Sequence, residues 1–193
     1  MFKQAITKEL HHPIIICEGA RLVGKSYLVN SVKDAFEVYK YPFIEWNRHI
    51  KENGLNKDFN PEIFYLAFGH DTCIFDMREK GLLDPTKKLI QDRGFLSNAV
   101  FGIQSKRITK EEVIINLKWQ LAKWPHDAFK IIYVSAAIRE DNRDKDEWTI
   151  YDPEETHRLY IELMHELSIP YINFFNSFDK KSELDFFEIL RKI

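Results

Sequence analysis

Residues 14–26 read IIICEGARLVGKS, and this stretch decides the fold of the chain. The β-branched apolar run Ile14–Ile16 predicts a buried strand, and the apolar-periodic stretch that begins at Tyr27 predicts a helix. Between them, Gly19 and Gly24 stand at the spacing G-x-x-x-x-G-K-S of a phosphate-binding loop. A chance match in a chain of this length is on the order of one in a hundred, and the flanking strand and helix make it rarer.

The residue types in this loop suit the binding of nucleotide phosphates. Glycines let successive backbone N–H groups point at phosphate oxygens, and the following helix N-terminus adds partial positive charge. Lys25 is expected to reach the β- and γ-phosphates, and the Ser26 hydroxyl to bind Mg²⁺. We predict that the nucleotide is bound by Gly19, Ala20, Arg21, Leu22, Val23, Gly24, Lys25, Ser26 and Tyr27.

Composition sets the broad class of the protein. The 193 residues are 45% hydrophobic and 30% charged, which is typical of a globular protein, and we expect residues 1–193 to form one domain. A net charge of −2 argues against a nucleic-acid polymer as partner. Cys17 and Cys73 are interpreted as core residues, and no stretch resembles a membrane span or signal peptide, so a cytoplasmic setting is expected.

Apolar strands alternate with helical patterns along the chain, which predicts an α/β fold with a parallel sheet covered on both faces. The predicted strands are residues 13–17, 37–44, 88–91, 130–134 and 171–175. The first predicted helix runs from Gly24 to Phe36, and the last spans residues 182–191 with Ser182 at its cap.

In an open parallel sheet the ligand lies beyond the carboxyl ends of the strands. The second strand leads to Glu45, the third to Asp92 and Arg93, and the fourth to Arg139 and Arg143. We therefore expect these side chains to gather near the phosphate loop, where phosphoryl transfer needs positioning and charge neutralisation.

Each of these residues has a candidate role beside Lys25. Asp92 is expected to share the Mg²⁺ with Ser26, Arg93 to clamp a phosphate, and Glu45 to accept the proton of an attacking hydroxyl. Arg139 and Arg143, one helical turn apart, would stabilise the transferred charge. Each role has an alternative interpretation. Asp92 could be a turn residue and Arg93 a partner in a surface ion pair. Glu45 could be an exposed carboxylate, and Arg139 and Arg143 could lie in a solvated loop.

Four features together resemble the thymidylate kinase and deoxynucleoside kinase superfamily of P-loop nucleoside and nucleotide kinases. They are Glu18-Gly19…Gly24-Lys25-Ser26, Asp92-Arg93-x-x-x-Ser97, Arg139-x-x-x-Arg143 and Tyr160-x-x-Leu163…Pro170. The resemblance implies a three-layer α/β/α fold with five parallel strands in the order 2-3-1-4-5 and a lid at about residues 138–152. It also implies ATP and Mg²⁺ as cofactors, a pyrimidine-type deoxynucleotide or deoxynucleoside substrate, and a homodimer.

The sequence stands between the two branches of that superfamily. Arg21 replaces the aspartate of thymidylate kinases, and residues 68–71, FGHD, lack their arginine. Glu45-Trp46 is similar to the base of deoxynucleoside kinases, whereas Gly94 departs from their acid-Arg-Ser motif. Asp92 and the pattern around Tyr160 favour the nucleotide kinases.

Three functions follow from these observations. The first is ATP- and Mg²⁺-dependent phosphoryl transfer to a (deoxy)nucleoside monophosphate, with phosphorylation of a free deoxynucleoside as its alternative. The second is a nucleotide-binding NTPase or regulator that has no acceptor kinase activity. The third is another small-molecule kinase on the same scaffold.

Overall fold

The computed structural model describes residues 13–40, 88–122, 124, 128–137 and 152–193. Five strands of this part form one all-parallel sheet in the order β2-β3-β1-β4-β5. They are β1 (Ile14–Glu18), β2 (Glu37–Lys40), β3 (Leu89–Asp92), β4 (Phe129–Ser135) and β5 (Tyr171–Phe175). The strand order confirms the one that the resemblance implies.

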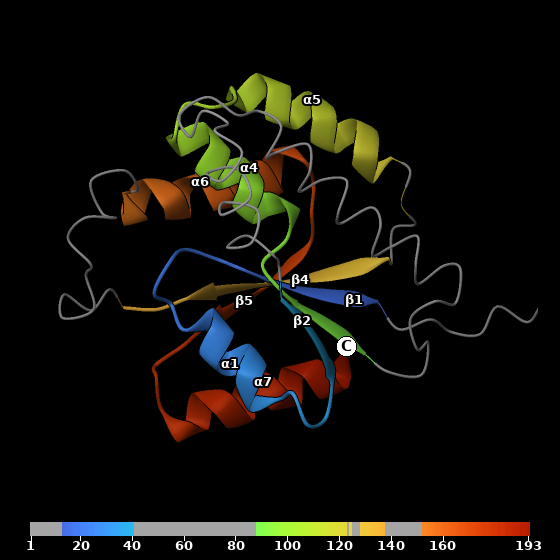
Figure 1. The fold of residues 1–193 in the computed structure, drawn as a ribbon, viewed down its shortest axis with the longest axis vertical. Helices are drawn as coiled ribbons and strands as arrows, with labels where there is room; N and C mark the ends of the chain where they lie inside the picture. The colour runs from blue at the N-terminus through green and yellow to red at the C-terminus, as the bar shows by residue number, and fades with distance from the viewer. Residues whose placement is uncertain (1–12, 41–87, 123, 125–127, 138–151) are drawn as a thin grey trace, which may run out of the picture.

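Helices cover both faces of the sheet, as Figure 1 shows, so the expected three layers are confirmed. On one face lie α4 (Phe95–Gln104), α5 (Lys110–Leu121) and α6 (Pro153–Glu166). On the other face lie α1 (Lys25–Ser31) and α7 (Lys180–Lys192).

The alternation of side chains along β1 divides the core into two clusters. Ile14 and Ile16 pack among the buried residues of α4, α5 and α6, whereas Ile15 and Cys17 pack among those of α1 and α7. Both faces of this strand are therefore apolar, as a central parallel strand requires. Cys17 is a core residue as predicted, and its burial raises the pKa of the thiol well above its ordinary value.

The helix boundaries differ from the prediction at two places. The first helix ends at Ser31 rather than Phe36, and residues 32–36 turn the chain into β2. The interpretation of Ser182 as a cap residue was wrong, because α7 begins at Lys180 and its N-cap is Asp179, whose carboxylate accepts the Ser182 N–H at 2.7 Å. The predicted part of the second strand beyond Lys40 lies outside the described residues.

The register of the sheet determines which residues meet at its carboxyl edge. Cys17 in β1 is paired with Asp92 in β3, and Glu18 is paired with Tyr133 in β4. The end of β3 therefore lies beside the point where the chain leaves β1 for its glycine loop. Among the helices of the described residues, none is both long and apolar enough to cross a bilayer.

Candidate active site

The loop of residues 19–24 joins β1 to α1 and has the backbone of a phosphate cradle. Gly19, Leu22 and Gly24 all have positive φ angles, of 141°, 62° and 78°. At Gly19 a Cβ would lie well under 3.0 Å from the backbone carbonyl oxygen of Val134, so only glycine fits there. The first glycine of the motif is thus required by the close approach of β4.

Lys25, the first residue of α1, is almost completely buried. Its ammonium donates a hydrogen bond to the backbone carbonyl oxygen of Ala20, so the side chain folds back over the loop. Burial, and next the charge of Arg93, hold the pKa of this ammonium well below its ordinary value, while Asp92 and Glu18 act in the opposite direction. A phosphate bound in the loop would add negative charge and favour the charged ammonium.

Ser26 and Asp92 are brought into contact from elements 66 positions apart in the chain. The Ser26 hydroxyl donates to Asp92 Oδ2 at 2.5 Å. The other carboxylate oxygen, Asp92 Oδ1, is buried and has no hydrogen-bond partner within the described part of the chain. A hydroxyl beside a carboxylate with one oxygen unpartnered fits Mg²⁺, which favours hard oxygen ligands and takes its remaining ligands from phosphates and water.

Arg93 extends along the start of the loop. Its backbone, at φ 72°, donates an N–H to the Cys17 carbonyl at 3.0 Å. Its Nη1 donates to the Gly19 carbonyl and to Ser97 Oγ, both at 3.4 Å, and the guanidinium lies 5.2 Å from the centre of the Phe101 ring. The guanidinium therefore lies beside Gly19, where the phosphate cradle begins.

Glu18 lies next to this candidate site, and no role was predicted for it from the sequence. Its carboxylate is completely buried and accepts the backbone N–H groups of Gly94, Leu96 and Ser97 at 3.1–3.2 Å. At Gly94 a Cβ would lie 2.7 Å from Cγ2 of Ile16, which gives a steric reason for glycine where the resemblance leads one to expect serine. The sequence feature that could have pointed to Glu18 is a charged residue at the end of an apolar strand.

Asn176, directly after β5, was also missed. Its side chain is buried, donates from Nδ2 to the Val23 carbonyl at 2.9 Å, and accepts the Phe178 N–H at 3.0 Å. It therefore supports the second end of the loop, beside Gly24. The only sequence signal was an asparagine that follows an apolar strand.

The structure thus brings together Lys25, Ser26, Asp92 and Arg93. Tyr27 turns to α7, where its hydroxyl donates to Glu183 at 2.5 Å, and Leu22 is exposed at the loop. Three predicted site residues, Glu45, Arg139 and Arg143, and the predicted lid up to residue 151 lie outside the described residues.

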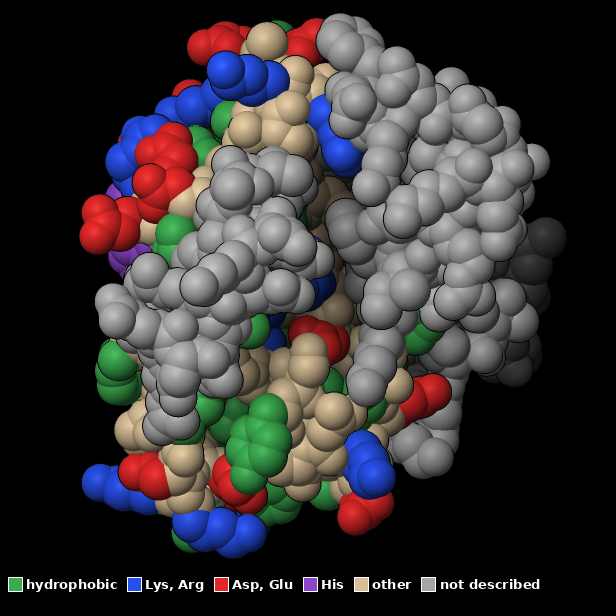
Figure 2. All heavy atoms as spheres, turned by 60° about the vertical axis from the view of Figure 1, so that its left-hand side comes forward, with side chains coloured by type: hydrophobic (Ala, Val, Ile, Leu, Met, Phe, Trp, Pro, Cys, Tyr) green, Lys and Arg blue, Asp and Glu red, His purple; other side chains and the backbone are tan. Residues whose placement is uncertain are grey.

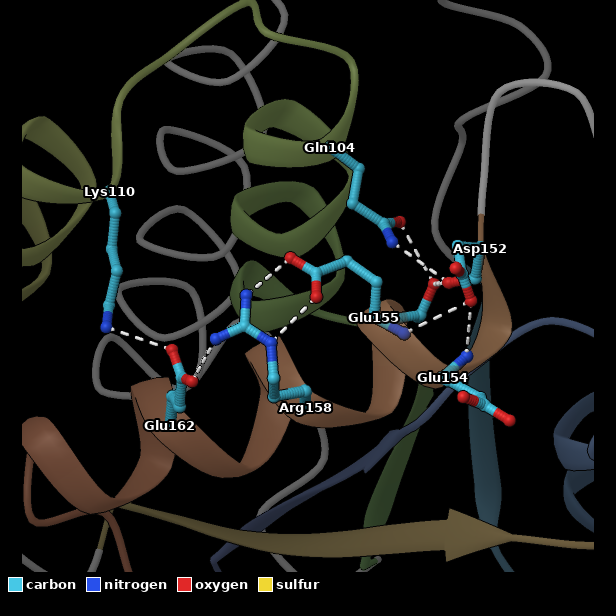
Figure 3. Close-up of polar contacts among 8 residues, drawn as sticks. Gln104, Lys110, Asp152, Glu154, Glu155, Arg158 and Glu162 are labelled. Atoms are coloured by element: carbon cyan, nitrogen blue, oxygen red, sulfur yellow. Dashed lines mark hydrogen bonds and ion pairs between the residues drawn. The ribbon is translucent and has the colours of Figure 1, made fainter.

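A second group of polar side chains lies on the exposed surface of α4, α5 and α6 (Figure 3). Arg158 donates to Glu155 at 2.7 Å and also pairs with Glu162, which Lys110 contacts at 3.0 Å. Figure 2 shows acidic and basic side chains interspersed over one face of the molecule. The described charges on that face are therefore mixed rather than gathered into one basic surface.

No protein-family model matches the chain, and no curated protein matches its sequence. Solved structures do match. A deoxyadenosine kinase from M. mycoides with the products dCMP and a flexible dCDP bound aligns with a TM-score of 0.57 and 16% identity over 93% of this chain and 99% of that one. A thymidylate kinase from Ehrlichia chaffeensis aligns with a TM-score of 0.59 and 11% identity over 93% and 98%.

The NadR protein in complex with NAD and AMP-PNP aligns with a TM-score of 0.60 and 10% identity. That alignment covers 94% of this chain but only 49% of NadR, so the chain spans about half of that protein. At these identities the matches establish the fold, which is that of the P-loop nucleoside and nucleotide kinases.

Proposed function

We propose that this protein is a kinase that transfers a phosphoryl group from ATP, with Mg²⁺, to a (deoxy)nucleoside monophosphate. The observation that carries this proposal is that the lysine of the P-loop lies beside a hydroxyl and a carboxylate that contact each other. Ser26 contacts Asp92 at 2.5 Å directly beside Lys25, and Asp92 has one oxygen without a partner. The nucleotides bound in the similar structures support a nucleotide or nucleoside as substrate.

The chain's own residues divide the reaction between them. Backbone N–H groups of residues 19–24 and the Lys25 ammonium bind the donor phosphates, and Ser26 and Asp92 hold the metal. The metal, when bound, neutralises charge on the phosphates. Arg93 is placed to orient an incoming phosphate, because its guanidinium lies beside Gly19.

Three residues outside the described part of the chain complete the proposal. Arg139 and Arg143 would stabilise charge on the transferred group. Glu45 would act as a general base if the acceptor is a free hydroxyl. A homodimer and a lid at residues 138–152 stay predictions.

The test uses purified protein, ATP and Mg²⁺ with a panel of nucleoside monophosphates, free deoxynucleosides and no acceptor. Lys25→Ala should abolish product formation, because the loop loses the cation that reaches the β- and γ-phosphates. Lys33→Ala, at an exposed lysine just after α1, is the matched control and should leave the rate unchanged. Full activity of Lys25→Ala would refute the assignment.

Deoxynucleoside phosphorylation is the second candidate. It is favoured by the match to deoxyadenosine kinase, which covers nearly the whole of both chains. Product from free deoxynucleosides alone would replace the monophosphate proposal with this one. Steady ATP hydrolysis that no acceptor changes would instead support an NTPase or regulator.

A further inference from the structure

The buried carboxylate of Glu18 has no part in the function proposed so far. It ends β1, directly before Gly19, and its side chain is completely buried. Three backbone N–H groups and the Ser97 hydroxyl donate hydrogen bonds to its two oxygens. These hydrogen bonds orient the carboxylate toward the first turn of α4, in the interior of the protein, and not toward a ligand.

The contacts of Glu18 join the two segments that form the candidate site. Its donors belong to Gly94, Leu96 and Ser97, which directly follow Asp92 and Arg93 in the chain. A negative charge at a helix N-terminus is stabilised by the helix dipole and by the free amides of the first turn. The carboxylate therefore fixes the start of α4 against the start of the phosphate loop.

A third element is joined to the same carboxylate. The Tyr160 hydroxyl of α6 lies 2.8 Å from Ser97 Oγ and 3.5 Å from Glu18 Oε2. Burial, and next the charge of Glu18, raise the pKa of Tyr160 well above its ordinary value, so this hydroxyl keeps its proton. Because Tyr160 and Ser97 are both buried, the chain of hydrogen bonds runs through the core from α6 to β1.

Close packing also holds the backbone of residue 94 against β1. A Cβ at Gly94 would lie 2.7 Å from Ile16 Cγ2 and 3.3 Å from Glu18 Oε1, so the backbone of residue 94 lies as close to β1 as a glycine allows. The Arg93 N–H to Cys17 carbonyl bond at 3.0 Å lies one residue before this contact. Arg93 and Gly94, the two residues that follow Asp92, are therefore both attached to β1.

We propose that Glu18 is a positioning residue for phosphoryl transfer, which sets Asp92 and Arg93 at the distance from the phosphate loop that Mg²⁺ and the nucleotide require. This inference rests on the proposed function, because it assigns Glu18 to the same site. Glu18 acts through Asp92 and Arg93, and it contacts neither phosphate nor metal itself.

Glu18→Gln is the principal variant. Glutamine keeps the size and one oxygen for the three amides, but it replaces the second oxygen by an NH₂ group and removes the charge. We expect the Mg²⁺ concentration for half-maximal ATP binding and activity to rise about tenfold, the size seen when a partner that orients a metal ligand is lost. ATP affinity without Mg²⁺ should change by less than about twofold, because the loop amides and Lys25 remain.

Two further variants separate positioning from folding. Ser97→Ala removes the hydroxyl donor to Glu18 and should shift the Mg²⁺ dependence in the same direction by a smaller factor. Val113→Ala, at a buried residue of α5, is the control, because it lowers stability without removing any of these hydrogen bonds. The measurements are calorimetric titrations of ATP with and without Mg²⁺, steady-state rates, and thermal unfolding to confirm that each variant is folded.

The outcomes distinguish the two proposals. A wild-type protein that binds ATP with Mg²⁺, beside a folded Glu18→Gln with unchanged Mg²⁺ dependence, overturns the positioning role and leaves the kinase proposal intact. A wild-type protein that does not bind ATP with Mg²⁺ overturns the proposed function, and this role with it. If Glu18→Gln fails to fold, an unchanged Mg²⁺ dependence in Ser97→Ala overturns the positioning role.

Discussion

The two ends of the phosphate loop are held by different kinds of contact. At the first end, Gly19 lies against the backbone of Val134, and the preceding Glu18 fixes α4 with a buried charge. At the second end, Gly24 lies against the side chains of Asn176 and Phe178, and the support is a neutral amide. Backbone inside a sheet cannot move aside, whereas a side chain can change rotamer. The first end is therefore the rigid reference of the site, and the second end can adjust.

The largest effect is expected from Gly19→Ala. The new Cβ would meet the Val134 carbonyl oxygen, and the φ of 141° is one that residues other than glycine rarely adopt. Strain and overlap together should cost at least about 3 kcal/mol of unfolding free energy, measured by urea denaturation. Gly102→Ala in α4 is the comparison variant, because its Cβ would lie 2.9 Å from Ile108 Cγ2, so that side chain must shift, whereas helix propensity favours alanine and the loss should be smaller than at Gly19.

Gly24→Ala should cost less, about 2 kcal/mol, because the left-handed φ of 78° is milder and the neighbours are side chains. The double variant with Asn176→Ala sharpens the comparison. Asn176→Ala removes the nearer of the two contacts of the new Cβ and leaves the Phe178 ring, so the loss in the double variant should be smaller than the sum of the two single losses. If the two losses of unfolding free energy simply add in the double variant, the second end of the loop is as rigid as the first.

Asn176→Ala alone should cost about 1–2 kcal/mol, because it leaves the Val23 carbonyl and the Phe178 N–H without their side-chain partner. The same change should weaken ATP binding, since Val23 precedes the turn at Gly24. Urea denaturation and calorimetric titration measure the two effects. Ser31→Ala, in the last turn of α1, is a suitable control, because its hydroxyl donates to the Leu28 carbonyl within its own helix turn. An equal loss of affinity in both variants would contradict a local role for Asn176.

The same contrast explains what the sequence could predict. The glycine loop is a local pattern, and the strand order follows from the family that the motifs resemble, so the cradle and the neighbouring Asp92 were both predicted. Glu18 and Asn176 were not assigned roles because their partners lie 76 to 79 and 153 positions away in the chain. No periodicity in a sequence encodes which amide a buried carboxylate will meet.

The end of α1 and the direction of the Tyr27 side chain were not predicted, for a related reason. The apolar residues Val32 and Phe36 extend a helical period in the sequence, but the structure uses them to pack the turn into β2, with Phe36 against Phe187 of α7. Tyr27 was assigned to the cradle by its place in the motif, yet its side chain turns to Glu183. A helix face is chosen by tertiary contacts, which override local propensity.

The smallest effect is expected at the partly exposed carboxylate of Glu162, which contrasts with the buried carboxylate of Glu18. Its bond with Lys110, which is the main cause, holds the pKa of Glu162 below its ordinary value. A lowered pKa in the folded state stabilises the protein above the unfolded pKa of about 4.3, and this stabilisation is lost as pH falls through the folded value. Glu162→Gln should therefore cost at most about 1 kcal/mol at pH 7 and low salt.

That cost should shrink in 1 M salt and disappear as the pH falls through the lowered pKa of the folded protein, below which the wild-type carboxyl is also protonated. Urea denaturation of both proteins at pH 7 and across an acidic pH series measures it. In Glu162→Gln the Mg²⁺ dependence of ATP binding should stay that of the wild type, because the residue lies in the surface group of Figure 3, on the outer face of α6. A shift in that dependence would mean that a charge on the outer face of α6 also influences the loop. The positioning role could then no longer be assigned to the buried, hydrogen-bonded carboxylate of Glu18 in particular.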